Sequence, residues 1–176
     1  DGFRGISIPA YGDTDYDLTD RARMMYLTSQ LLLERKLCNQ NIGYDKRISQ
    51  RFGLMFGEIV WDTMLAQHTL TCEFPKDLGF LTSIHTDMSY YKDEGHEFNP
   101  SVNSYDKLYE YNCKDAISAF QIMIKQEADL KDMGMYEFFT QFVMKLFNMY
   151  YDIDSCGIPQ DIIKKDELLS KYEGLR

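Results

Sequence analysis

Short apolar runs in this sequence lead directly into helical patterns, which restricts the chain to a small set of architectures. Residues 37–40 and 58–61 are predicted strands. A helix over residues 44–52 is predicted to follow the first strand, and Asp62 with Thr63 begins a helix after the second. An alternating run over residues 5–9, ended by proline, predicts an edge strand. Strands that alternate with helices indicate an α/β layer in roughly the first 130 residues.

The remaining segments are predicted to be mainly helical. One helix is expected to begin after Asp17 or Thr19, and another at Pro75. A long helix is predicted over residues 105–132, and an amphipathic stripe follows over residues 139–153. We therefore expect one unit at residues 1–133 and a helical connection to a neighbouring domain at residues 134–176.

Composition excludes several classes of protein. The chain has 176 residues, of which 44% are apolar and 14% aromatic, so it can form a core and is not globally disordered. Its net charge of −9 argues against a general nucleic-acid binder, because phosphate is repelled at long range. Four scattered cysteines without a C-x-x-C pair predict reduced thiols in a cytoplasmic protein. No basic-then-apolar pattern is present, so we expect no signal peptide, and the apolar runs are too short to span a membrane.

Two pairs of polar residues have the spacing of one helical turn. Asn41 and Asp45 are four residues apart where a strand passes into a helix, and Tyr111 and Asp115 have the same spacing within a helix. A carboxylate that holds a cation beside a phenol that orients water is a hydrolytic arrangement. Each pair is also typical of an ordinary turn or of a surface carboxylate beside a half-buried tyrosine, and both interpretations stay open here.

Taken in order along the chain, these motifs resemble those of a known family. The run N-I-G-Y-D-K-R-I-S-Q-R-F-G-L, with I-V-W-D-T-M-L-A-Q-H after it, resembles the second exonuclease motif of family A DNA polymerases, from bacteria and phages. The segment from Tyr111 to Asp115 resembles the third motif, Tyr-x-x-x-Asp, and G-I-P-Q-D at residues 157–161 resembles the start of the polymerase domain. The resemblance implies an RNase H-like fold and a 3′–5′ proofreading exonuclease.

The resemblance also implies roles for individual residues. Asp45 and Asp115 would be metal ligands of a two-ion site for Mg²⁺ or Mn²⁺, and Tyr111 would orient the attacking water. Asn41 would support the substrate or the local backbone. The histidine variant of the family would have His where this chain has Glu110, so the chain is of the tyrosine type. The implied partners are a single-stranded 3′ end of DNA and the remainder of a polymerase chain.

The first motif of the family, Asp-x-Glu on the first strand, occurs nowhere in the sequence. We therefore expect an incomplete RNase H-like fold whose first strands are absent, in a chain that is a portion of a longer polymerase. Because the metal site lacks these acids, we expect the chain alone to bind metal poorly and to cut little or no DNA.

Substrate contacts are expected from residues that interleave aromatic and basic groups. Lys76, Tyr90, Tyr91 and Lys92 have the composition of a stacking platform for single-stranded ends, but the favoured alternative is a loop whose tyrosines pack against their own helices. Two other functions remain open. One is an RNase D-like exonuclease, and the other is a non-catalytic scaffold that supports a polymerase domain.

Overall fold

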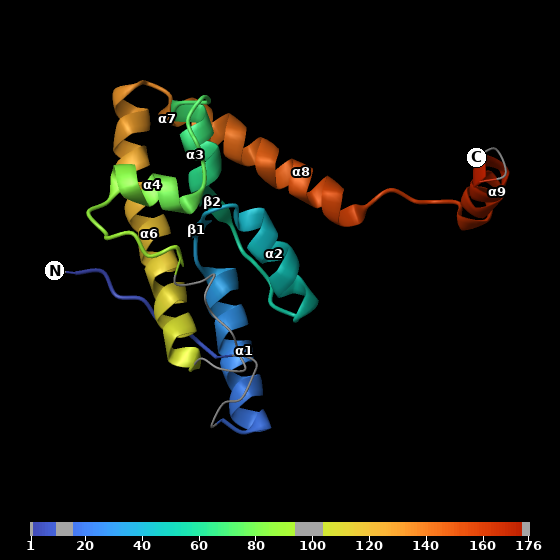
Figure 1. Ribbon diagram of the computed structural model, residues 1–176, viewed down its shortest axis with the longest axis horizontal. Coiled ribbons are helices and arrows are strands. Elements are labelled where there is room, and N and C mark those ends of the chain that lie inside the picture. Colours follow the sequence, from blue (N-terminus) through green and yellow to red (C-terminus); the bar gives the residue numbers. More distant parts are fainter. Residues whose placement is uncertain (1, 10–15, 94–103, 174–176) are drawn as a thin grey trace.

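The computed structural model describes residues 2–9, 16–93 and 104–173. Within these residues the protein is a mainly helical α/β structure with a small parallel sheet (Figure 1). Strand β1 (Leu37–Asn39) pairs with β2 (Ile59–Asp62), with Leu37 opposite Ile59 and Asn39 opposite Asp62. Both predicted strands are confirmed to within about one residue, and so is the alternation of strands with helices.

Each strand leads directly into a helix at the same edge of the sheet. Helix α2 (Ile42–Arg51) follows β1, and helix α3 (Thr63–Leu70) follows β2. The Asp62 side chain accepts hydrogen bonds from the backbone N–H groups of Met64 and Leu65, so the predicted cap of α3 is confirmed. Because parallel strands end at the same edge, the first turns of α2 and α3 lie beside each other.

Helix α6 (Tyr105–Asp132) packs against α3 and against α4 (Leu78–His85). Its predicted bounds are confirmed, and it is followed by Gly134 at a φ of 66°. The buried Gln126 ties α6 to the β2–α3 junction: its amide donates to the Thr63 carbonyl at 3.0 Å and its oxygen accepts from Trp61 Nε1 at 3.3 Å. This link fixes the position of α6 relative to the sheet.

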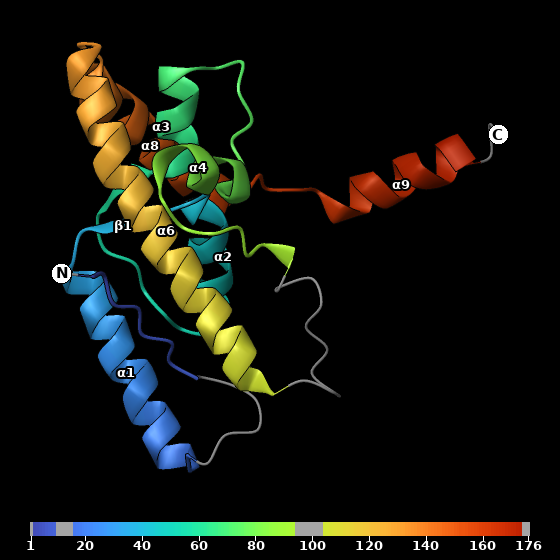
Figure 2. The same ribbon diagram turned by 60° about the vertical axis from the view of Figure 1, so that its left-hand side comes forward.

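The last part of the described chain is helical, as expected. A short helix α7 (Tyr136–Phe138) and a π-helical turn η1 (Phe139–Val143) lead into α8 (Met144–Cys156), and α9 (Ile162–Glu173) lies apart from the other helices (Figures 1 and 2). Phe139 packs on Trp61 with ring centroids 4.6 Å apart. The main hydrophobic cluster therefore draws residues from both predicted units, namely Ile42, Ile59, Trp61, Ala66, Leu130, Phe139 and Met144.

Helix α1 (Leu18–Glu34) is capped by Asp17, as predicted, and contains no fully buried residue. It approaches the loop before β2, where the Gly57 N–H donates to the Leu32 carbonyl at 3.0 Å. A Cβ at position 57 would lie 2.4 Å from the Leu33 carbonyl oxygen, so glycine permits this close approach. Several apolar side chains of α1, such as Leu27 and Leu31, remain exposed.

One predicted strand and the predicted start of one helix are wrong. Residues 5–9 do not form a strand: they run as irregular chain along α6, where Phe3 meets Phe120 edge to face at 5.7 Å and Ile6 is 85% exposed. An alternating pattern makes a strand only where a neighbouring strand pairs with it, and none among the described residues does. Pro75 does not begin α4, because Asp77 caps that helix through the Phe80 N–H and the helix begins at Leu78.

Candidate functional site

Four polar side chains meet where α6 passes the segment after α4. They are Tyr91 and Lys92 from that segment and Tyr111 and Asp115 from α6, and we call them the Asp115 cluster. The spacing of Tyr111 and Asp115 places both on one face of α6, as the sequence predicts. The segment after α4 lies against that face and adds one tyrosine and one cation.

Tyr91 is a buried part of this cluster, with 4% of its surface exposed. Its hydroxyl donates to Asp115 Oδ1 at 2.9 Å and lies 2.8 Å from Ser118 Oγ, which donates to the Lys114 carbonyl or to Met88 Sδ. Burial and the neighbouring Asp115 raise the pKa of the Tyr91 phenol above its ordinary value. Tyr91 therefore remains a proton donor that orients Asp115, and its ring has no open face for a nucleic-acid base.

Lys92 lies at the centre of the Asp115 cluster. Its Nζ is 2.5 Å from Asp115 Oδ1 and 3.3 Å from the Tyr111 hydroxyl oxygen. The same ammonium lies 5.3 Å from the ring centroid of Tyr91 and 5.2 Å from that of Tyr111. Only 18% of the Lys92 side chain and 31% of the Asp115 side chain are exposed, so the pair is better shielded than a typical surface ion pair.

Asp45, the other carboxylate that the sequence singled out, lies in the first turn of α2. Its Oδ2 accepts a hydrogen bond from Asn39 Nδ2 at 2.8 Å, which ties it to the end of β1. Burial raises the pKa of the Asp45 carboxyl above its ordinary value, the Asn39 hydrogen bond opposes this, and the negative charges of Asp62 and Asp115 add to the increase. The pKa of Asp45 thus depends in part on the negative charge of Asp115.

Asp62 sets the position of α2 and hence of Asp45. Besides capping α3, its carboxylate accepts from the N–H of Asn41 at 3.2 Å and of Ile42 at 2.9 Å. The side chain is 1% exposed, and burial raises its pKa while the backbone hydrogen bonds oppose that shift. Asn41 takes a left-handed conformation at a φ of 51° to make this turn, and the structure shows no capping hydrogen bond from its side chain.

The other predicted contact residue, Lys76, is engaged in its own loop. Its Nζ donates to the carbonyls of Cys72 and Phe74 at 2.7 and 2.9 Å, and its carbonyl accepts from Gln40 Nε2. Tyr90 keeps an exposed ring. The expected set of substrate residues is thus divided, with Tyr91 and Lys92 in the Asp115 cluster and Lys76 bonded elsewhere.

The donor atoms near Asp115 suit a hard divalent cation. Asp45, Asp115 and Tyr111 offer oxygen atoms, and Mg²⁺ usually takes one or two carboxylates and completes its shell with water and substrate oxygens. Within the part of the chain that the structure describes, no group of three or more His, Cys, Asp or Glu residues could hold a metal ion. These residues alone therefore do not make up the two-ion site that the resemblance implies, which would need further acids.

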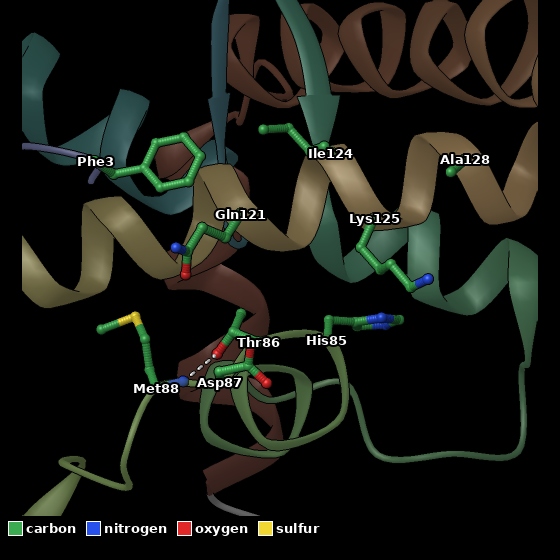
Figure 3. Close-up of a pocket in the computed structure, with 9 residues that line it drawn as sticks. All are labelled: Phe3, His85, Thr86, Asp87, Met88, Gln121, Ile124, Lys125 and Ala128. Carbon is green, nitrogen blue, oxygen red and sulfur yellow. Dashed lines mark hydrogen bonds between the residues drawn. The ribbon is translucent and has the colours of Figure 1, made fainter. Parts of the chain in front are cut away.

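A separate cavity of about 520 Å³ lies farther along α6 (Figure 3). Its wall includes Phe3, His85, Met88, Gln121 and Lys125. Gln121 Oε1 is buried there without a hydrogen-bond partner among the described residues. Burial lowers the pKa of His85, whose Nε2 lies 2.9 Å from the Gln67 amide oxygen of α3, so this histidine is a packing residue.

Sequence reasoning missed Asn39 and Ser118 as supports of the two carboxylates. Asn39 is the last residue of β1, and polar residues at strand ends are a detectable signal in α/β proteins. Ser118 is less conspicuous, because its contact with Tyr91 joins positions 27 residues apart.

No helix among the described residues is long and apolar enough to cross a lipid bilayer. Comparison of the whole chain with known proteins gave no match to any family model, curated protein or solved structure.

Proposed function

We propose that this chain is the tyrosine-type 3′–5′ exonuclease segment of a family A DNA polymerase, with an RNase H-like fold that lacks its first motif. The observation that carries the proposal is that Tyr111 and Asp115 share one face of α6, while Asn39, at the end of a strand that α6 contacts, holds Asp45. The resemblance described above assigns metal binding to the two aspartates and the positioning of water to the tyrosine. Coarser support comes from the parallel strands that end beside this site.

In the proposed reaction Asp45 and Asp115 would hold divalent cations, Mg²⁺ or Mn²⁺, together with acids from elsewhere in the longer polypeptide. When bound, such ions lower the pKa of water and stabilise negative charge on a phosphate undergoing in-line displacement. The Tyr111 hydroxyl accepts from Lys92, so its own hydrogen is free to point at a water molecule. Tyr91 and Asn39 hold the carboxylates in place, and the product is a nucleoside monophosphate released from a frayed 3′ end.

The proposal accounts for nucleic-acid binding by an acidic chain. Bound cations reverse the local sign of the charge at the place where the phosphate sits, whatever the net charge of −9. Lys92 and the exposed Tyr90 lie on the segment beside the cluster and are the proposed contacts to the single strand. The acids of the absent first motif are proposed to come from elsewhere in the longer polymerase, a cytoplasmic protein that corrects replication errors.

The proposed role of Tyr111 can be tested in the full-length polypeptide that contains these 176 residues. The assay follows the release of the 3′-terminal nucleotide from single-stranded DNA in Mg²⁺. Tyr111→Phe removes the hydroxyl that orients water, and we expect the rate to fall about 100-fold. Tyr109→Phe, two positions earlier on the same helix, is the matched control and is expected to leave the rate within about twofold of wild type.

An unchanged rate in Tyr111→Phe would contradict the proposed role of this residue. A full-length protein that releases no nucleotide in Mg²⁺ or Mn²⁺ would instead favour the second candidate, a non-catalytic scaffold for the polymerase domain. That candidate is supported by the absence of Asp-x-Glu from the sequence and of any three-ligand metal group from the described residues.

A further inference from the structure

The cavity farther along α6 contains an unmet hydrogen bond. Gln121 lines this cavity of about 520 Å³, and its Oε1 is buried without a donor from any residue that the structure describes. A buried acceptor without a partner costs free energy, so folded proteins usually pair it with the chain, with water or with a ligand. The volume of the cavity is typical of sites for small molecules. The unpaired amide oxygen therefore points to a ligand that brings the missing donor.

The wall of the cavity suits an amphipathic molecule better than water. Its apolar members are Phe3, Met88, Ile124 and Ala128. The Thr86 hydroxyl is already engaged, because it donates to the Thr82 carbonyl at 2.8 Å and accepts from the Met88 N–H at 3.2 Å, the bond dashed in Figure 3. A buried water usually makes about three hydrogen bonds, and this wall offers few partners for them. A molecule with an apolar body and a donor group satisfies both the wall and the Gln121 amide.

The charges at the cavity favour a cation over an anion. Its charged lining residues are the exposed Asp87 and Lys125, and the Lys125 ammonium lies 3.8 Å from Asp129 Oδ1. His85 adds no charge at neutral pH, because burial lowers its pKa. Two carboxylates thus stand against one ammonium at this place, in a chain whose net charge of −9 also attracts cations.

We propose that this cavity binds a small organic amine in its ammonium form, with an aromatic or branched apolar body. In Figure 3 the Gln121 amide points from α6 toward the segment that carries Asp87 and Met88, so one ligand can meet both sides of the cavity. The ammonium donates to Gln121 Oε1 and is attracted by the Asp87 carboxylate. The apolar body packs on Met88 and on the half-exposed ring of Phe3, which can also attract the cation through its face. None of these residues belongs to the Asp115 cluster, so the inference does not rest on the proposed exonuclease.

The test measures the binding of two probes to the polypeptide that contains these 176 residues, by ligand-observed NMR at neutral pH. For 3-phenylpropylamine we expect saturable binding with a Kd near or below about 1 mM, as suits a ligand of this size. The second probe, 3-phenylpropionate, has the same ring and a carboxylate in place of the ammonium. It is expected to bind at least about tenfold more weakly, because the carboxylate finds no donor at Gln121 and is repelled by Asp87.

Variants of the wall place the binding in this cavity. Gln121→Met keeps the length of the side chain and removes the acceptor, and we expect the Kd for the amine to rise at least about fivefold. Gln141→Met is the matched control, because Gln141 is an exposed glutamine of η1 outside the cavity wall, and its Kd is expected within about twofold of wild type. Asp87→Asn is expected to reduce the preference for the amine over the carboxylate at least about threefold.

Thermal unfolding shows whether the Gln121→Met variant is folded. Its midpoint without ligand is expected at or above the wild-type value, because the substitution removes a buried polar atom that has no partner. A lower midpoint would contradict the unpaired state of this amide.

No saturable binding of the amine would overturn the inference, and the cavity would then hold water or another part of the polypeptide. Equal binding of the carboxylate probe would also overturn it, as would an unchanged Kd in folded Gln121→Met. None of these measurements involves metal or DNA, so the amine site and the proposed exonuclease can fail independently of each other.

Discussion

Asp45 is the residue whose environment most directly links the two motifs. Its carboxyl is shielded from water, accepts one hydrogen bond from Asn39, and lies near the charges of Asp62 and Asp115. Burial and like charge both favour the protonated form, so the pKa of Asp45 is raised. The carboxylic acid is therefore expected to keep its proton to a higher pH than an exposed aspartate does.

This coupling predicts the effect of removing Asp115. In Asp115→Asn the negative charge is lost, so the pKa of Asp45 is expected to move down toward its ordinary value, as measured by NMR titration of the side-chain carboxyl carbon. A carboxyl with a raised folded-state pKa contributes stability at low pH that is lost as the pH rises through that pKa. As the pH rises through this acidic range, the free energy of unfolding of the variant should therefore fall less than that of the wild-type protein.

Asp129→Asn is the control for this titration, because it removes an aspartate from the same helix α6 that does not contribute to the shift at Asp45. An Asp45 pKa that stays at its wild-type value in Asp115→Asn would contradict the electrostatic contact between the two carboxylates.

At the residue scale, sequence reasoning found the pairs that local geometry creates and missed those that the tertiary fold creates. Tyr111 and Asp115 share a face because one helical turn separates them. The contact of Lys92 with Asp115 spans 23 residues, and no local pattern indicates it. Tyr91 was expected at a stacking surface, but the packing of its segment against α6 buries the ring.

Among the elements, the junction of α2 and α3 depends on a single carboxylate. Asp62 accepts four backbone N–H groups, those of Asn41 and Ile42 from α2 and those of Met64 and Leu65 from α3. These donors have no partners within their own helices, because the first N–H groups of a helix lack an acceptor. One buried side chain thus caps two helices and holds Asp45 near α6.

We predict that Asp62→Ala lowers the free energy of unfolding by about 3 kcal/mol, because it removes two helix caps and leaves buried N–H donors without an acceptor. Asp77→Ala is the matched control, because Asp77 caps only α4 through the Phe80 N–H, and its loss should cost about 1 kcal/mol. Urea unfolding followed by the fluorescence of Trp61, the single tryptophan, measures both values. Equal losses in the two variants would contradict the double cap.

The helix ends that were predicted well carry local signals. Asp17 caps α1 and Gly134 follows α6 at a φ of 66°, and each of these residues acts within one turn of the helix. The second cap by Asp62 was missed because Ile42 is 20 residues away in the sequence. The strand expected at residues 5–9 failed for the same reason, since a strand requires a neighbour that the local pattern does not contain.

The whole molecule leaves many apolar side chains uncovered. Leu27 and Leu31 on α1, Phe142 and Ile153 on α8, and much of α9 are exposed, although they follow helical spacing. Amphipathic helices usually bury such faces. Under the proposed function, these faces pack against the missing strands and the remainder of the polymerase chain. The division of the chain into two units after residue 133 stays a prediction.

The most direct test of the account is the rate at which the full-length polypeptide removes a mismatched 3′-terminal nucleotide, compared between wild type and Asp115→Asn. If the proposed function holds, Asp115→Asn loses this activity by at least about 100-fold, because a proposed ligand of the metal that would stabilise the transition state is gone, while DNA synthesis by the same protein continues. A variant that removes the mismatched nucleotide within about twofold of the wild-type rate would contradict it.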